Sequence, residues 1–181
     1  MLDHVLRVYD LAKAHDMEPM IWSDMFFRLA TGGQYDSENI SAEHFAEVRK
    51  VLPEDLQLIY WNYYSSKEKV YDEMLEAHLF MTPNIGFAGG AWKWTGYNPA
   101  NAYSFFVADL AFSACQKHNI PYIVVTAWGD NGAEASFFSI LPALQYWAEL
   151  NYGHIKPHDA WLEQRFYTCT NASWKHFLAL D

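Results

Sequence analysis

Aromatic rings stand beside polar side chains at the ends of four short apolar segments of the chain. A flat ring can cover the apolar C–H face of a pyranose, and a neighbouring carboxylate, amide or hydroxyl can bond to the sugar hydroxyls. Aromatic residues make up 18% of the chain, which is more than core packing usually demands. We therefore predict a carbohydrate-binding site built from Trp22 and Asp24; Tyr60, Trp61, Asn62, Tyr63 and Tyr64; Trp92 and Trp94; and Trp128 and Asp130.

Each of these positions also has a structural interpretation. A single tryptophan at a strand end often covers the core beneath it, and Asp130 or Asn131 could cap a helix that starts near Ala135. Lys93, which lies between two tryptophans, could be a solvent-facing charge. Four ends of the same kind in one chain favour the binding interpretation over four separate structural ones.

The four segments are predicted to be strands because each is apolar and follows a helical pattern. The predicted helix and strand pairs are 2–16 with PMIW at 19–22, 41–51 with LQLIYW at 56–61, a helix from about 66 with NIGFAGGAW at 84–92, and 99–119 with IPYIVVTAW at 120–128. Continuous apolar strands are typical of a parallel sheet covered by helices. We predict an α/β fold with about four helix-strand units, half of a TIM-type parallel (β/α) barrel.

A further helix at about 136–150 and a tail with one or two closing helices follow the last predicted strand. We therefore predict two parts, with residues 1–151 as the half-barrel and residues 152–181 as the closing C-terminal helices. In an α/β barrel, the side chains that meet the substrate sit at the carboxyl ends of the strands. The four aromatic ends should thus lie at the same edge of the sheet.

Composition narrows the classes of function. The formal net charge of −10 opposes binding to nucleic acid or to anionic membranes. Two distant cysteines and eight histidines without metal-ligand spacing indicate neither a disulfide framework nor a metal site, and simple serine-hydrolase, dinucleotide and P-loop motifs are absent. We expect no cofactor. The N-terminal segment has the pattern of a helix rather than a secretory signal, so we expect a cytoplasmic protein.

Four phrases carry a family resemblance: PMIWSDMFFR, LIYWNYYS, FAGGAWKWTGY and VTAWGDNGAE. In this order and spacing they resemble the later barrel strands of glycoside hydrolase family 20, the β-N-acetylhexosaminidases, and are most like the compact bacterial exo-β-N-acetylglucosaminidases. The resemblance covers nearly the whole chain. It implies a retaining, substrate-assisted hydrolysis in which the substrate's acetamide group is the nucleophile, an Asp orients it and the adjacent Glu protonates the leaving oxygen.

The resemblance also implies roles for individual residues. The aromatic walls of the acetamide pocket would be Trp22, Trp61 or Trp92, and Trp128. Tyr63 would donate a hydrogen bond to the acetamide oxygen, with Tyr60 as the next choice.

Two polar positions depart from the family pattern. Asp130 matches a carboxylate that accepts hydrogen bonds from sugar hydroxyls, although many members have Glu there. Asn62 stands where relatives often have Asp.

The family's adjacent Asp-Glu pair belongs to the tip of the fourth barrel strand, and this chain begins in the helix after that point. Glu54 and Asp55 are in reversed order and precede their strand. We therefore expect half of an enzyme, inactive alone. It would bind glycans that end in N-acetylhexosamine and, because a half-barrel has open strand edges, would pair with a second copy or with the missing N-terminal half.

Two further hypotheses stay open. The chain could be a non-catalytic module that binds N-acetylhexosamine, since stacking and hydroxyl contacts need no acid catalyst. Alternatively, Asp24 and Asp130 could form their own acid and nucleophile pair, which requires carboxyl groups about 5 to 5.5 Å or about 6.5 to 9.5 Å apart.

Overall fold

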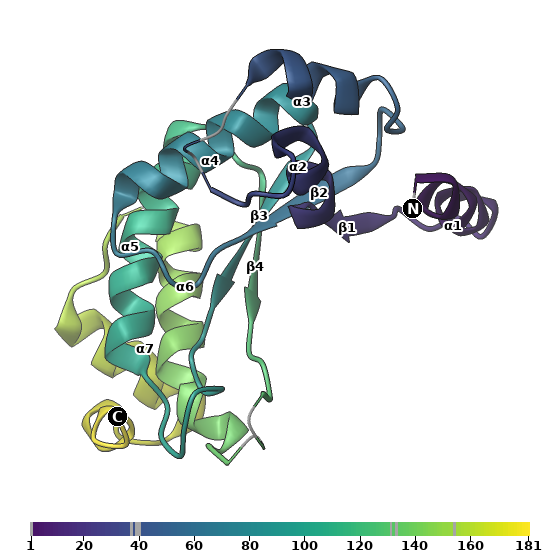
Figure 1. Cartoon of the computed structure of the whole chain (residues 1–181). Coiled ribbons are helices and arrows are strands. Elements are labelled where there is room, and N and C mark those ends of the chain that lie inside the picture. Colours follow the sequence, from purple (N-terminus) through teal and green to yellow (C-terminus); the bar gives the residue numbers. More distant parts are fainter. Residues whose placement is uncertain (1, 37, 39–40, 131, 133, 154) are drawn as a thin grey trace. The chain divides into compact units, whose positions relative to one another are not determined.

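A computed structural model describes residues 2–36, 38, 41–130, 132, 134–153 and 155–181. Helices and strands alternate along most of the chain (Figure 1). The strands are β1 (Met20–Trp22), β2 (Gln57–Trp61), β3 (Ile85–Gly90) and β4 (Tyr122–Thr126). The helices are α1 (Leu2–Ala14), α2 (Asp24–Thr31), α3 (Ala42–Arg49), α4 (Glu68–Met81), α5 (Asn101–Lys117), the 3-10 helix η1 (Phe137–Ile140), α6 (Leu141–Gly153), α7 (Asp159–Thr170) and α8 (Trp174–Leu178).

The four strands form one parallel sheet in the order β1-β2-β3-β4. In the register, Trp22 pairs with Ile59 and Trp61 pairs with Ala88. A helix connects each strand to the next, as parallel pairing requires. The prediction of an α/β fold with a parallel sheet of four successive strands is therefore confirmed.

Several predicted boundaries follow local capping chemistry. The hydroxyl of Ser41 accepts a hydrogen bond from the backbone N–H of His44 and so caps α3. Asn119 adopts a left-handed conformation with φ of 52° two residues after the end of α5, where the helical pattern was expected to end. The helix expected over 136–150 divides into η1 and α6, and Ser136 caps η1 by accepting from Phe138. Asn131 lies outside the described residues.

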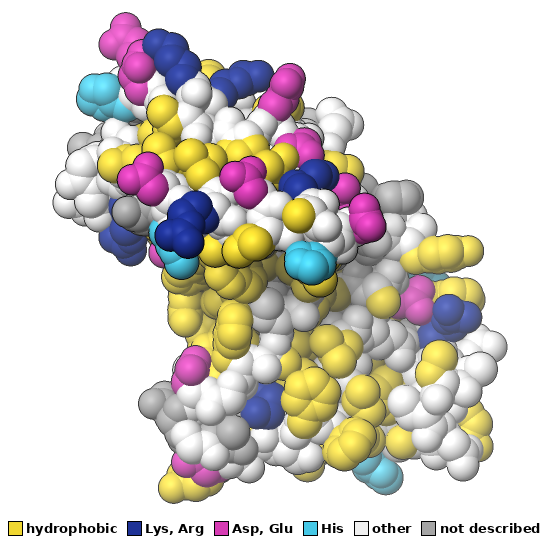
Figure 2. Space-filling model, turned by 90° about the vertical axis from the view of Figure 1, so that its right-hand side faces the viewer, with side chains coloured by type: hydrophobic (Ala, Val, Ile, Leu, Met, Phe, Trp, Pro, Cys, Tyr) yellow, Lys and Arg dark blue, Asp and Glu magenta, His cyan; other side chains and the backbone are white. Residues whose placement is uncertain are grey.

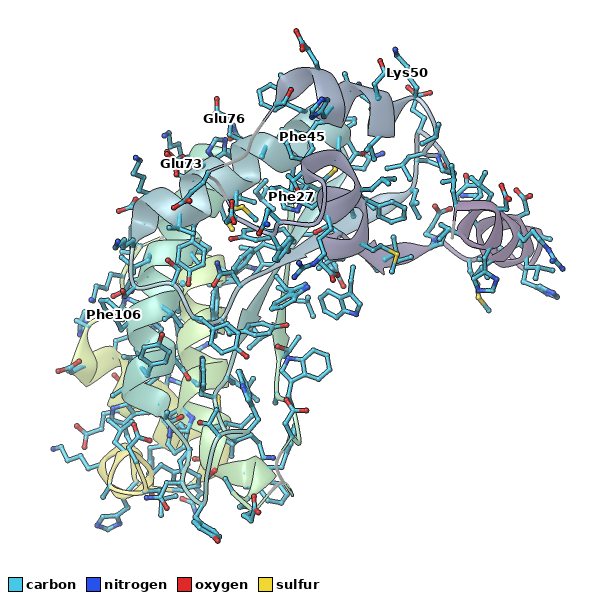
Figure 3. All side chains as sticks on the ribbon, viewed as in Figure 1. Phe27, Phe45, Lys50, Glu73, Glu76 and Phe106 are labelled. Carbon is cyan, nitrogen blue, oxygen red and sulfur yellow. The ribbon has the colours of Figure 1, made fainter. Side chains whose placement is uncertain are left out.

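Helix α2 follows β1 directly, in a segment for which the sequence analysis assigned no element. Ser23 occupies the N-cap position, and Gly32 ends the helix with φ of 73°. A serine before an apolar stretch and a glycine after it are ordinary helix boundaries, so the signal was present in the sequence. The buried face includes Phe26 and Phe27, and the Phe27 ring lies 4.9 Å from the ring of Phe45 on α3 (Figure 3).

The chain divides into two compact units. Unit 1 comprises residues 1–61, 69–88 and 114–122, and unit 2 comprises residues 62–68, 89–113 and 123–181. The helices α7 and α8, which were expected to be a closing tail, belong to unit 2.

Aromatic stacking and a carboxylate cap hold the helices of unit 2 together. Phe105 of α5 stacks on Tyr146 of α6, with ring centroids 4.5 Å apart, and on Trp174 of α8 at 5.7 Å. The carboxylate of Asp181 accepts hydrogen bonds from the first backbone N–H groups of α5, including that of Ala102 at 2.7 Å. None of the described helices is long and apolar enough to span a lipid bilayer.

Candidate functional site

In unit 1, the carboxyl ends of β1 and β2 bring two tryptophans and a carboxylate together. Trp22 is the last residue of β1 and is 37% exposed. Asp24 begins α2, and its Oδ1 accepts a hydrogen bond from Nε1 of Trp61 at 3.5 Å. Tyr35 packs its ring 5.5 Å from that of Trp61. This set offers an exposed ring surface next to a carboxylate that an indole N–H orients.

Tyr60 and Trp61 face opposite sides of the sheet because successive side chains of a strand alternate, although the Tyr35 ring contacts both, at 6.4 Å and 5.5 Å. Its side chain is fully buried, with its ring 4.8 Å from the imidazole of His78 and 5.5 Å from the ring of Phe87. Tyr60 therefore packs in the core of unit 1, and Tyr63 remains the tyrosine on which we base the proposal below.

In unit 2, three aromatic side chains form a compact cluster. The rings of Trp92 and Trp94 stack with centroids 4.5 Å apart, and the Tyr63 ring meets Trp94 edge-on at 5.4 Å. Nε1 of Trp92 donates to the backbone carbonyl of Tyr63 at 3.1 Å. A Cβ added at Gly90 would lie 2.8 Å from Trp94 and 3.1 Å from Tyr63, so the cluster requires a glycine there.

The Tyr63 hydroxyl lies against the end of β4. Burial raises the pKa of Tyr63 above its usual value of 10.0, while hydrogen bonds with the side chains of Thr126 and Trp128 act in the opposite direction. The phenol is therefore protonated at neutral pH and can donate a hydrogen bond. Trp128 itself is 38% exposed, so its ring is accessible to a ligand.

Lys93 is not the solvent-facing charge that its sequence neighbours suggested. Only 5% of its surface is exposed, and its Nζ donates to the backbone carbonyl of Trp128 at 3.4 Å. The four-carbon stem runs through the protein, so the ammonium group reaches the end of β4. A cation thus stands at the aromatic end of unit 2.

The remaining polar positions have simpler environments. Oδ1 of Asn62 accepts hydrogen bonds from the backbone N–H groups of Tyr64 and Ser65 at 3.0 and 3.1 Å, which makes it a turn former. Asp130 is exposed. Asp55, of the reversed pair, accepts from the Tyr9 hydroxyl and pairs with Lys13 at 3.0 Å, so it ties α1 to the segment before β2.

The sequence analysis missed a buried polar pair in unit 1. His78 was expected to be solvated, like the other histidines, but the structure places it on the buried side of α4 with no exposed surface. Its Nε2 lies 2.8 Å from Oγ of Ser23, and its Nδ1 lies 2.6 Å from the carbonyl oxygen of Met74. Burial lowers the pKa of His78 to about 4. The pair connects the inside of α4 with the end of β1.

Two larger cavities lie elsewhere. One of about 650 Å³ in unit 1 is lined by α2 and α3, and one of about 630 Å³ in unit 2 is lined by α5 to α8, including Phe106, whose side chain is 45% exposed (Figure 3). Among the described residues, no three His, Cys, Asp or Glu side chains lie close enough together to hold a metal ion.

No protein-family model matches the chain, and no curated protein matches it. What the site can do is therefore inferred from its own residues. Asp24 belongs to unit 1 and Asp130 belongs to unit 2, and each follows an exposed tryptophan by two positions in the sequence. The arrangement in each unit suits an uncharged ligand with one apolar face and several hydroxyls.

Proposed function

We propose that this chain is part of an exo-β-N-acetylhexosaminidase, which hydrolyses terminal β-linked N-acetylglucosamine or N-acetylgalactosamine with retention of configuration. The chain supplies the aromatic sugar pocket, and a separate half supplies the adjacent Asp and Glu. One observation carries the proposal: the Tyr63 hydroxyl bonds the side chains of Thr126 and Trp128 within a cluster of tryptophan rings. A phenol donor framed by indoles is suited to an acetamide, which has a flat apolar methyl end and a carbonyl acceptor.

In the proposed reaction, the acetamide oxygen of the substrate attacks the anomeric carbon while the bond to the leaving oxygen breaks. Tyr63 donates a hydrogen bond to that acetamide oxygen and directs it toward the anomeric carbon. The Glu of the other half gives its proton to the leaving oxygen, and the Asp accepts from the acetamide N–H. Water then opens the oxazolinium intermediate and regenerates the acetamide.

Residues proposed to bind sugar occur in each of the two units. In unit 1, Trp22 offers the exposed ring, and Asp24, held by Trp61, accepts from sugar hydroxyls. In unit 2, Trp128 offers the exposed ring and Asp130 the exposed carboxylate. Behind them Trp92 and Trp94 support Tyr63, while Asn62 shapes the turn that carries it.

The proposal includes a complete (β/α)8 barrel, of which this chain forms half. In the order of the described strands, β1 and β4 are the outer ones, so each has an edge that a further strand can pair. Hydrophobic side chains gather over a broad area of one face (Figure 2). The missing N-terminal half, or a second copy, would cover such a surface. Cys115 and Cys169 are both free thiols, which fits the proposed cytoplasmic location.

The experiment that tests the proposal measures hydrolysis of aryl β-N-acetylglucosaminide and β-N-acetylgalactosaminide by three samples: this chain, a separately expressed N-terminal half with the Asp-Glu pair, and their mixture. Activity is expected in the mixture alone. Activity of this chain by itself would instead favour Asp24 and Asp130 as the acid and nucleophile, and their Asn variants would then abolish it.

A binding module is the second candidate, and it is favoured because the Asp-Glu dipeptide of this sequence, Asp72–Glu73, lies within α4 and not at the end of a strand. It predicts that N-acetylglucosamine quenches or enhances tryptophan fluorescence of the chain, while the mixture with the N-terminal half hydrolyses nothing. Turnover by the mixture excludes this candidate.

A further inference from the structure

The end of β1 is held from the inside by the buried Ser23–His78 pair. Ser23 lies between Trp22 and Asp24, and like His78 it has no exposed surface. Its backbone N–H donates to the carbonyl of Ile59 at 3.0 Å, and its side chain lies 2.8 Å from Nε2 of His78. Both neighbours of Ser23 are residues that the proposed function places on the sugar.

The protonation of His78 follows from its partners. The carbonyl oxygen of Met74 can only accept a hydrogen bond, so Nδ1 of His78, 2.6 Å away, carries the proton. Burial keeps the imidazole neutral at neutral pH, since it lowers the pKa of His78 to about 4. Nε2 therefore presents a lone pair, and the Ser23 hydroxyl donates to it.

Because it bonds His78, the Ser23 hydroxyl does not cap α2. Ser23 stands at the N-cap of α2, where a serine oxygen normally accepts from a backbone N–H of the first turn. Among the described residues of α2, none bonds this hydroxyl. The N–H groups of Phe26 and Phe27 bond the Ser23 carbonyl instead, at 3.0 and 2.9 Å. The side chain of Ser23 therefore bonds His78 of α4, and no hydrogen bond of this side chain caps α2.

Aromatic rings fix the imidazole in place. The centroids of Phe27 and Tyr60 each lie 4.8 Å from that of His78, with interplanar angles of 32° and 34°. The Tyr35 ring approaches edge-on at 6.5 Å. A ring packed in this way cannot turn to a new partner without disturbing its neighbours, so Nε2 stays directed at Ser23.

We propose that Ser23 and His78 are a positioning pair that sets the direction of Trp22 and Asp24 for contact with an acetamido sugar. The proposal rests on the function proposed above, because it assigns the pair to that site. Neither residue contacts the sugar. They act through the backbone of residues 22–24, and the Trp61–Asp24 hydrogen bond reports their effect.

The first test needs no variant. A long-range proton–nitrogen correlation spectrum of the full chain at pH 7 distinguishes the two neutral imidazole tautomers. The expected tautomer of His78 has a proton on Nδ1 and none on Nε2. A protonated Nε2 would overturn the proposal, because Ser23 would then be an acceptor with its own proton directed elsewhere.

The second test compares Ser23→Ala with Thr82→Val in the full chain. Thr82 is a matched control, because it is also a buried hydroxyl of unit 1 and accepts from the N–H of Asn84 at 3.0 Å near the end of α4. In Ser23→Ala, we expect the indole N–H resonance of Trp61 to shift and the affinity for N-acetylglucosamine to fall about tenfold. Thr82→Val should change neither.

The outcomes separate the two proposals. A folded Ser23→Ala chain with an unmoved Trp61 resonance and unchanged affinity rejects the positioning role. A wild-type chain that does not bind N-acetylglucosamine, together with a mixture that shows no turnover, rejects the proposed function, and the Trp61 resonance then decides the positioning role by itself. The conservative variant Ser23→Cys keeps a weak donor at the same place and should recover part of the lost affinity.

Discussion

The two units hold their aromatic residues by different means. In unit 2, rings support one another: Trp92 stacks on Trp94, and Tyr63 packs against Trp94 edge-on. In unit 1, the carboxylate of Asp24 accepts from the Trp61 indole, and Ser23, which stands between Trp22 and Asp24, bonds His78. Contacts between aromatic rings do not depend on protonation. The contact between Ser23 and His78 does, because it needs a neutral imidazole. The two units should therefore respond differently to truncation and to pH.

The largest expected effect is in unit 2. Trp92→Ala removes a ring that is 8% exposed, and it also removes the hydrogen bond to the Tyr63 carbonyl. The free energy of unfolding should fall by about 3–5 kcal/mol, because a large cavity remains. Urea denaturation measures this loss.

The matched control is Trp161→Ala. Trp161 also belongs to unit 2, but it is 40% exposed and bonds Glu149 on the surface. Its removal should cost at most about 1 kcal/mol. Equal losses in the two variants would show that the cluster does not stabilise the fold, and the contrast between the units would then disappear.

The next effect belongs to unit 1 and depends on pH. The pKa of His78 is lowered from 6.5 to about 4 in the folded chain, so the unfolded chain binds more protons between these values. The stabilisation is therefore fully present above pH 6.5 and is lost as the pH falls toward 4, by about 3 kcal/mol. Urea denaturation at a series of pH values measures it.

His78→Phe should be less stable at pH 7 but should lose less stability on acidification than the wild type. His44→Gln is the control, because His44 is exposed on α3 and its variant should keep the wild-type slope. If the slope of His78→Phe equals that of the wild type, another group causes the acid sensitivity of unit 1.

Local chemistry explains why much of the fold could be predicted. The Ser41 cap, the left-handed Asn119 and the apolar strands are each readable within a few residues, and the order of helix and strand then favours parallel pairing. Helix α2 was missed although Ser23 and Gly32 mark its ends, because no strand follows it within the repeating helix-strand pattern.

The site was less predictable, because burial depends on contacts between distant segments. His78 lies on a helix with many charged residues, and its burial follows from which face of α4 meets the core. Lys93 was expected in solvent, yet its stem is long enough to bring the ammonium to the Trp128 carbonyl. The alternation along β2 separates Tyr60 from Trp61, but it does not by itself decide which of them faces the core.

A smaller effect is expected on the affinity for N-acetylglucosamine when the hydroxyl of Tyr63 in unit 2 is removed. Tyr63→Phe keeps the ring and removes the hydroxyl that bonds Thr126 and Trp128. We expect about tenfold weaker binding of N-acetylglucosamine, or about 1.4 kcal/mol, since one donor to the acetamide is lost. Tryptophan fluorescence titration measures the affinity.

Tyr64→Phe is the control for this variant, since Tyr64 is the adjacent tyrosine and is 56% exposed. It should bind like the wild type. Weaker binding by both variants to the same degree would indicate a general change in the segment, and unchanged binding by Tyr63→Phe would remove the acetamide donor from the proposal.

The smallest expected effect concerns a polar contact of unit 2, between Lys93 and the backbone of Trp128. Lys93→Met keeps the length of the stem and removes a buried ammonium whose Nζ bonds the Trp128 carbonyl at 3.4 Å. The lost bond and the relieved cost of burying a charge oppose each other, so the free energy of unfolding should change by less than about 1 kcal/mol in either direction. The exposed Lys50→Met gives the baseline in the same urea titration. A loss of about 3 kcal/mol or more would mean that a charge-assisted contact holds the end of β4, and that both units rely on polar anchors.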